Sequence, residues 1–232
     1  MASRYSIGIE KEAFERRFSV DATDNYKPRY NAAPTQILPV ITNTAAEGVS
    51  FLYWGVQPHW TKNKKISDKL IQVHANRIQE RAVLQKNLLQ RRCIIPSNGY
   101  FDWKNITKKS QIPYRIFMPT EAVFSMAGIW EEYEDENENL ISTFKIITTN
   151  ANEVAAELSD TMPVIFTKKE EEIWLSADSE IDDLLALLQT PSDENLTKYT
   201  ISPRINSLDN DREDLLLHAQ PADQFGNYSL FD

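Results

Sequence analysis

The chain has a single cysteine among its 232 residues, only three histidines, and no long apolar run. One cysteine excludes an internal disulfide and a thiolate zinc site, and the histidines lack metal-ligand spacing, so we expect no metal and no other cofactor. No stretch reaches the roughly 18 consecutive apolar residues of a membrane helix. Residues 1–6 lack the basic-then-apolar pattern of a signal peptide. We therefore expect a cytoplasmic protein without a membrane partner.

The chain is also short of positive charge, with 25 basic against 34 acidic residues and a net charge of −9. This balance argues against a nucleic-acid partner, but it hides an asymmetry. Residues 60–116 carry 13 of the basic residues and three acidic ones, a local charge of +10, which leaves −19 for the rest of the chain. Such a stretch can attract phosphates even on an acidic protein. A solvated basic face without a ligand is the alternative, and charge alone does not distinguish it from a phosphate-binding surface.

Residue patterns predict more strands than helices. β-branched and aromatic runs predict strands at 36–41, 49–54, 92–96, 100–104, 114–118, 123–130 and 143–148. Amphipathic spacing and capping boxes at Asn150 and Thr167 predict helices at 10–18, in part of 77–89, and at 150–158, 167–175 and 181–188. Residues 29–34 read as a loop, and 97–99 as a turn between strands. Because strands and helices do not alternate, we expect an α+β fold with a mainly antiparallel sheet. We expect one domain over 1–215 and a flexible tail at 216–232.

The common catalytic signatures are missing: there is no P-loop, G-x-G-x-x-G, G-x-S-x-G or H-E-x-x-H pattern. What remains is an ordered set of short phrases: M-A-S-R-Y at 1–5, R-Y-N-A-A-P at 29–34, W-G-V-Q-P-H-W at 54–60, A-N-R at 75–77, R-C-I-I-P at 92–96, G-Y-F-D-W-K at 99–104, F-S-M-A-G-I-W at 124–130, T-T at 148–149, S-D-T-M-P at 159–163 and R-I-N-S at 204–207. The set resembles the SOS-response-associated peptidase (SRAP) family from residue 1 to about 215. The resemblance implies a single domain with a barrel-like β core and peripheral helices. It also implies the family's function in the response to DNA damage, which is to bind abasic sites in single-stranded DNA and shield them through a covalent protein–DNA link.

The chemistry of that family depends on four positions, and this chain departs at each. In the family, removal of the initiator methionine exposes a cysteine whose amine forms a Schiff base and whose thiol closes a thiazolidine ring, assisted by an asparagine, a glutamate and a histidine. The corresponding positions hold other residues here: Ala2, Ala75, Asp102 and Ser159. The resemblance therefore implies impaired or lost covalent chemistry, and it leaves open whether the chain is still an enzyme of the peptidase, hydrolase or lyase type or a pseudoenzyme. A natural inactivated paralogue and an engineered variant both explain the four changes, and the breadth of the divergence favours the paralogue.

The positions that hold DNA in the family are better matched. The resemblance assigns them to Arg4, Asn31, Trp60, Arg77, Trp103 and Thr148. Aromatic stacking with basic contacts to phosphates suits single-stranded DNA, and Trp60, in a lysine-rich loop, is the best candidate for stacking. Trp54 and Trp130 are expected in the core, as is Cys93 in its apolar run.

Three functions remain open at this stage. The first is binding of single-stranded or abasic-site DNA with impaired or lost covalent chemistry, to which the free Ala2 amine adds the alternative of reversible capture as a Schiff base. The second is a non-catalytic protein-interaction module whose DNA site has decayed. The third is a working enzyme with rearranged catalytic groups.

The last residues carry a separate signal. Residues 227–231, N-Y-S-L-F, resemble the Q-L-S-L-F peptide that binds the bacterial sliding clamp, which would use Asn227, Leu230 and Phe231. The alternative is that this tail packs against its own domain. The oligomeric state cannot be read from the sequence.

Overall fold

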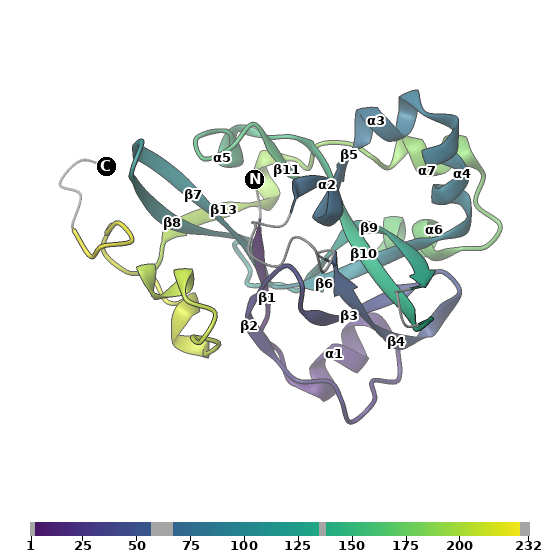
Figure 1. The fold of residues 1–232 in the computed structure, drawn as a ribbon, viewed down its shortest axis with the longest axis horizontal. Coiled ribbons are helices and arrows are strands. Elements are labelled where there is room, and N and C mark those ends of the chain that lie inside the picture. The colour runs from purple at the N-terminus through teal and green to yellow at the C-terminus, as the bar shows by residue number, and fades with distance from the viewer. Residues whose placement is uncertain (1–2, 57–66, 135–137, 228–232) are drawn as a thin grey trace.

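The computed structural model describes residues 3–56, 67–134 and 138–227 (Figure 1). Its strands form two sheets. The first has the order β13-β8-β7-β1-β2 and the second β11-β10-β4-β3-β6-β9-β12, with β5 paired to β10. All pairs are antiparallel except those of β10 with β4 and with β5. The expected α+β class with a mainly antiparallel β core is confirmed.

The strand bounds are as follows: β1 Arg4–Ile7, β2 Arg29–Ala32, β3 Ile37–Thr42, β4 Ala45–Trp54, β5 Gln72–His74, β6 Arg92–Ser97, β7 Gly99–Thr107, β8 Ser110–Phe117, β9 Phe124–Glu134, β10 Leu140–Asn150, β11 Thr161–Pro163, β12 Ile165–Phe166 and β13 Thr197–Thr200. The helices are α1 Lys11–Phe18, α2 Asp68–Ile71, α3 Ala75–Glu80, α4 Ala82–Gln90, α5 Glu153–Ala156, α6 Lys168–Leu175 and α7 Ile181–Ala186, with 3-10 turns η2 Asp193–Asn195, η3 Pro203–Asn206 and η4 Glu213–Leu216. No helix in the described ranges is long and apolar enough to cross a membrane.

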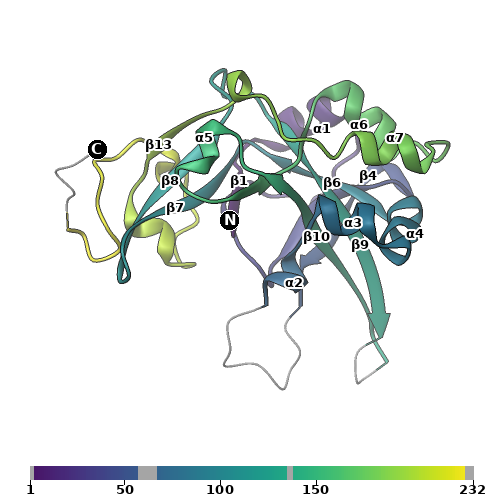
Figure 2. The ribbon, with the colours of Figure 1, turned by 90° about the horizontal axis from the view of Figure 1, so that it is seen from above.

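One hydrophobic core joins the two sheets. Tyr5 and Tyr100 from the first sheet and Trp54 and Ile95 from the second belong to the same cluster of buried side chains. The helices lie at the periphery, with α3, α4, α6 and α7 gathered at one end of the molecule (Figures 1 and 2). Cys93 is buried in this core, as expected.

Two local predictions were wrong in instructive ways. The stretch predicted as a loop at 29–34 contains β2, which pairs with β1 through Tyr5 and Ala32. A strand of four residues, with a proline close behind it, is too short to show alternation in the sequence. The helix cap predicted at Asn150 lies instead at Asn152, whose side chain accepts a hydrogen bond from the Ala155 N–H, because Asn150 is still paired with β11. The capping box at Thr167 is confirmed.

The turn predicted at 97–99 has a different role from a hairpin turn. Strands β6 and β7 on either side of it belong to different sheets, so the chain crosses from one sheet to the other at Asn98. The Asn98 N–H donates to the Ser6 carbonyl at 3.0 Å, and its side-chain oxygen accepts from the Gly8 N–H at 3.1 Å. This corner therefore fastens β1 to the point where the two sheets meet.

The predicted tail is described as far as residue 227, and that part contacts the domain. The Ala219 N–H donates to the Thr200 carbonyl, and Ala222 and Asp223 are buried. The Asp223 carboxylate accepts hydrogen bonds from the Ser110 hydroxyl and from both the backbone and the side chain of Asn227. Residues 217–227 are thus held against β13 and the tip of the β7–β8 hairpin.

Candidate functional site

The start of β1 lies beside the middle of β7. Their register pairs Arg4 with Phe101 and Tyr5 with Tyr100, and continued by one residue it sets Ser3 opposite Asp102. Asp102 is only 6% exposed, and burial raises the pKa of its carboxyl group above the usual range. The Trp103 N–H donates to its Oδ1 at 2.9 Å. A buried carboxyl group whose pKa is raised is a candidate for proton transfer.

Arg4 and Asn31 come together on the neighbouring strands β1 and β2. The Arg4 guanidinium donates to the Asn31 side-chain oxygen at 3.1 Å and to the Ile205 carbonyl at 3.1 Å. The buried Asn31 amide donates to three carbonyls between residues 205 and 210, at 2.9–3.1 Å. Burial lowers the pKa of Arg4 from its ordinary value, and within the described ranges no carboxylate is bonded to it. The two residues fix the 203–210 segment against the first sheet.

Trp103 lies on the opposite face of β7 from Asp102. Its ring packs against a small second cluster that contains Phe101 and Ile205, and its indole N–H donates to the Asn206 side chain at 3.0 Å. The ring is half-buried rather than enclosed. Trp103 and η3 therefore form a partly open apolar edge next to Arg4 and Asn31.

The second half of the site is built around Thr148 on β10. Thr148 is paired with His74 at the end of β5 and with Pro163 on β11. His74 is the N-cap of α3, and Ala75, the buried first residue of that helix, follows it directly. Ser159 is half-buried two residues before β11, and its hydroxyl accepts from the Thr161 N–H at 3.4 Å. The strand pairing thus places Ala75 directly after the partner of Thr148, whereas Ser159 precedes β11, four residues from Pro163.

Trp54 connects the two halves. Its ring lies 5.3 Å from that of Tyr5, centroid to centroid, and is stacked on Phe144 of β10. Its indole N–H donates to the carbonyl of Ile71 at 2.9 Å, directly before β5. In Figures 1 and 2 the start of β1 lies between the β7–β8 hairpin on one side and α2 and β10 on the other. Trp54 is 1% exposed, which confirms the prediction that it belongs to the core.

The basic segment does not form one continuous stripe. Arg92 and Arg115 are buried: Arg92 donates to four backbone carbonyls at the ends of α4 and α6, and Arg115 is paired with Glu121 at 2.8 Å. Arg91 lies over the Trp130 ring. The exposed cations of the segment that fall in the described ranges are Lys69, Arg77, Arg81, Lys86, Lys108 and Lys109. They lie in two groups, one on and near α2–α4 and one at the tip of the β7–β8 hairpin, with the start of β1 between them (Figure 1).

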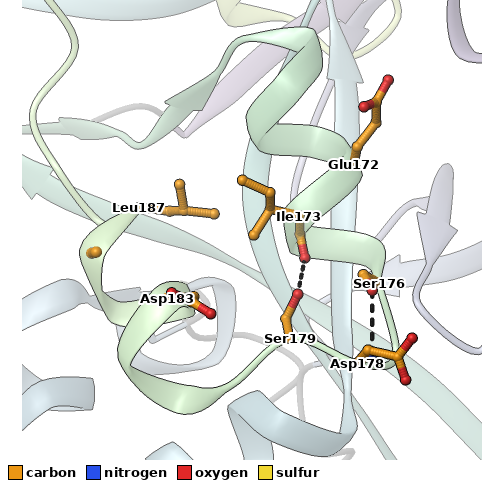
Figure 3. Close-up of a pocket in the computed structure, with 8 residues that line it drawn as sticks. Glu172, Ile173, Ser176, Asp178, Ser179, Asp183 and Leu187 are labelled. Carbon is orange, nitrogen blue, oxygen red and sulfur yellow. Dashed lines mark hydrogen bonds between the residues drawn. The ribbon is translucent and has the colours of Figure 1, made fainter.

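The hollow between α6 and α7 lies outside this region. It has a volume of about 620 Å³ and is lined by Glu172, Asp178 and Asp183 with no basic side chain (Figure 3). Its negative charge opposes a phosphate ligand. Within the described ranges, no group of three or more His, Cys, Asp or Glu residues is placed to hold a metal ion. Ala2, Trp60, Leu230 and Phe231, which the sequence analysis singled out, fall outside the described residues.

A sequence profile described as SOS response associated peptidase (SRAP) matches residues 1–208. The chain belongs to the SRAP family. The abasic site processing protein YoqW of Bacillus subtilis is 33% identical over 221 residues, which cover 93% of this chain and 99% of YoqW. The abasic site processing protein YMR114C of Saccharomyces cerevisiae is 26% identical over 83% of this chain and 53% of the yeast protein. A crystal structure of a protein from Bacteroides thetaiotaomicron superposes with a TM-score of 0.79 at 25% identity, over 94% of this chain and 99% of the other.

This SRAP chain also uses residues that sequence reasoning missed. Asp211 accepts from the backbone N–H groups of Tyr30 and Asn31 and pairs with Arg29 at 2.7 Å, so it fixes β2 beside the site. Asn206 holds the indole of Trp103. The R-I-N-S motif that contains Asn206 indicated a functional role for this residue. The sequence around Asp211 contains no such motif. His74, which no motif singled out, pairs with Thr148 and caps α3.

Proposed function

We propose that this protein binds single-stranded DNA that contains an abasic site and captures the sugar aldehyde reversibly through the α-amine of Ala2. The proposal places this activity in the cytoplasm, on damaged nucleoid DNA. The observation that carries it is the register of β1 on β7, which sets Ser3 opposite a buried carboxyl group. Membership of the SRAP family, and curated relatives named abasic site processing proteins, supply the substrate class.

The chemistry requires an amine and a proton carrier but no thiol. Removal of Met1 leaves the Ala2 amine, which attacks the aldehyde carbon and forms a carbinolamine. A proton then moves to the carbinolamine oxygen, which leaves as water while the C=N bond forms. Asp102, whose pKa is raised by burial, gives the proton to the departing oxygen and takes one from the nitrogen. Without a sulfur at position 2 the Schiff base cannot close to a ring, so water reverses it.

Trapping with borohydride tests the capture, because hydride reduces the C=N bond to a stable amine. A labelled single strand with one abasic site is incubated with the protein and borohydride, and adducts are separated on a denaturing gel. The expected result is an adduct whose mass maps to the N-terminal peptide. A strand with a tetrahydrofuran in place of the abasic sugar has no aldehyde and serves as the negative control.

Three variants sharpen the result. Ala2→Ser keeps a small residue and a free amine, so it should trap as the parent chain does. Ala2→Cys should give an adduct that survives without borohydride. Asp102→Asn should slow trapping by at least about a hundredfold, the lower end of the usual contribution of a proton-transfer group. If Ala2→Cys forms an adduct while the parent chain forms none, capture through Ala2 is excluded. If neither binds the abasic strand, the DNA function itself is wrong and the protein-interaction alternative takes its place.

DNA contact is assigned to the exposed cations on either side of the start of β1. Arg77 is exposed and makes no hydrogen bond or ion pair with the described residues, so its guanidinium is available for a phosphate. Removal of one phosphate contact should reduce the slope of log K against log salt by about 0.7 for a single strand. Arg77→Gln should show this change, whereas Lys11→Gln, whose lysine is bonded to Asp24 at 3.1 Å, should not.

The C-terminal peptide is proposed to bind a sliding clamp through Asn227, Leu230 and Phe231. The backbone and side chain of Asn227 donate to the Asp223 carboxylate, so clamp binding through Asn227 has to exchange the side-chain bond for one to the clamp. Deletion of residues 228–232 leaves these bonds intact and should abolish recovery of the protein on immobilised clamp. Leu230→Ala with Phe231→Ala should do the same. Equal recovery of the full-length chain and the truncated chain would refute the interaction.

A further inference from the structure

His74 is the histidine of the candidate site, and it has no part in the capture chemistry proposed for Ala2 and Asp102. It ends β5, pairs with Thr148 on β10, and caps the helix that begins with Ala75. The other histidine in the described ranges, His218, lies against the ring of Tyr199, on the side of the first sheet that carries the tail. A hydrogen-bonding side chain therefore lies beside Thr148, next to a position where the family's asparagine is replaced by alanine.

The hydrogen bond at the helix start determines which ring nitrogen of His74 carries a proton. The Asn76 backbone N–H donates to Nδ1 at 3.2 Å, so Nδ1 accepts and is unprotonated. The N–H donor of the neutral ring is therefore at Nε2.

The Nε2 atom has no hydrogen-bond partner among the described residues, and the ring is half-buried rather than enclosed. Arg77 follows three residues later, in the first turn of α3, with its side chain exposed. His74 is the N-cap of α3 and Arg77 is the third residue of the helix, so both side chains belong to the N-terminal end of α3. The phosphate oxygens of a DNA strand bound by Arg77 would lie within reach of the Nε2 proton.

We propose that His74 is a positioning residue for bound DNA: its neutral ring donates one hydrogen bond, from Nε2, to a phosphate oxygen beside the abasic site. This inference rests on the proposed function, because it needs a strand bound at this site. The donor adds a polar contact on the β5 side of the site. Since the ring is neutral, it orients the strand without adding a charge contact.

Two amide substitutions separate the roles of the two ring nitrogens. The side-chain oxygen of asparagine reaches the position of Nδ1, so His74→Asn keeps the helix cap and removes the Nε2 donor. The side-chain nitrogen of glutamine reaches the position of Nε2, so His74→Gln keeps the donor and removes the cap. Both are neutral and polar, and thermal unfolding of each variant shows what the cap contributes.

The measurement is anisotropy of a labelled single strand with one abasic site, titrated at several salt concentrations. We expect His74→Gln to bind within about threefold of the parent chain and His74→Asn to bind about tenfold more weakly, the effect of one hydrogen bond to a charged group. The salt slope of His74→Asn should equal that of the parent chain, whereas Arg77→Gln lowers it by about 0.7.

The outcomes distinguish the inference from the function on which it rests. If the parent chain does not bind the strand, the proposed function fails and this inference fails with it. If the parent chain binds and His74→Asn binds equally well, the residue only caps α3, and the inference alone is overturned. A lower salt slope for His74→Asn would mean that the ring is bound as a cation, which also contradicts a neutral donor.

Discussion

Replacement of Asn31 by alanine would remove the amide that joins β2 to the 203–210 segment. This amide donates to the carbonyls of Ile205, Ser207 and Asn210 and accepts from Arg4, and its residue is 1% exposed. An amide has two N–H donors, so the three carbonyls share two hydrogens, and with the accepted bond it makes the equivalent of three hydrogen bonds. At about 1 kcal/mol net for each, we expect Asn31→Ala to lower the free energy of unfolding by about 3 kcal/mol.

Urea unfolding followed by circular dichroism measures this decrease, and for a chain of this size it corresponds to a fall in Tm of about 6–12 °C. Asn210→Ala is the matched control, because it truncates the same residue type in the segment that Asn31 holds, while its side chain donates to a single carbonyl, that of Arg204. The control should change stability by no more than about 1 kcal/mol. If the two variants unfold at the same urea concentration, the amide of Asn31 does not hold the segment and the reasoning is wrong.

Three further outcomes follow from buried polar groups. Arg92→Lys should lower the free energy of unfolding by at least about 3 kcal/mol in urea titrations, because an ammonium cannot replace a guanidinium bonded to four carbonyls. Burial raises the pKa of the Cys93 thiol, so Cys93 should react with a thiol reagent such as DTNB only after unfolding, and fast labelling of the native protein would contradict its burial. Burial also raises the pKa of Asp102, so its contribution to stability is fully present below the ordinary Asp pKa and is lost as pH rises through the folded-state value. Asp102→Asn should therefore be more stable than the parent chain at pH 8 and lose that advantage at pH 4, which unfolding curves at both pH values will show.

The sequence predicted local elements well wherever neighbouring residues supply the signal. The amphipathic pair Phe14 and Phe18 marks α1, and Thr167 with Glu170 marks the start of α6, because caps and helix faces depend on contacts three or four residues apart. Strand β2 could not be read in this way. Its four residues are ordered by β1 on one side and by Asp211 on the other, and neither partner is adjacent in the chain.

The candidate site shows the same division. Motifs marked Arg4, Asn31 and Trp103, but their hydrogen-bond partners lie between residues 205 and 210. The net charge of +10 over residues 60–116 overstates the positive charge on the surface. Arg92 and Arg115 are buried and bonded within the protein, so DNA cannot contact them. Burial of individual cations depends on packing between helices and sheets, which residue counts do not encode. The place of His74 beside Thr148 likewise depends on a parallel strand pair that joins segments far apart in the chain.

Strand β1 is an interior strand of its sheet, held by β7 on one side and β2 on the other. Its backbone pairing begins at Arg4, and the Asn98 corner fixes its far end. Substitution of residues ahead of Arg4 therefore leaves this pairing intact. The amine that we propose as the capturing group and the strand that follows it can therefore change independently. Variants that differ only at position 2 can therefore be compared, in one folded domain, for their capture of the same aldehyde.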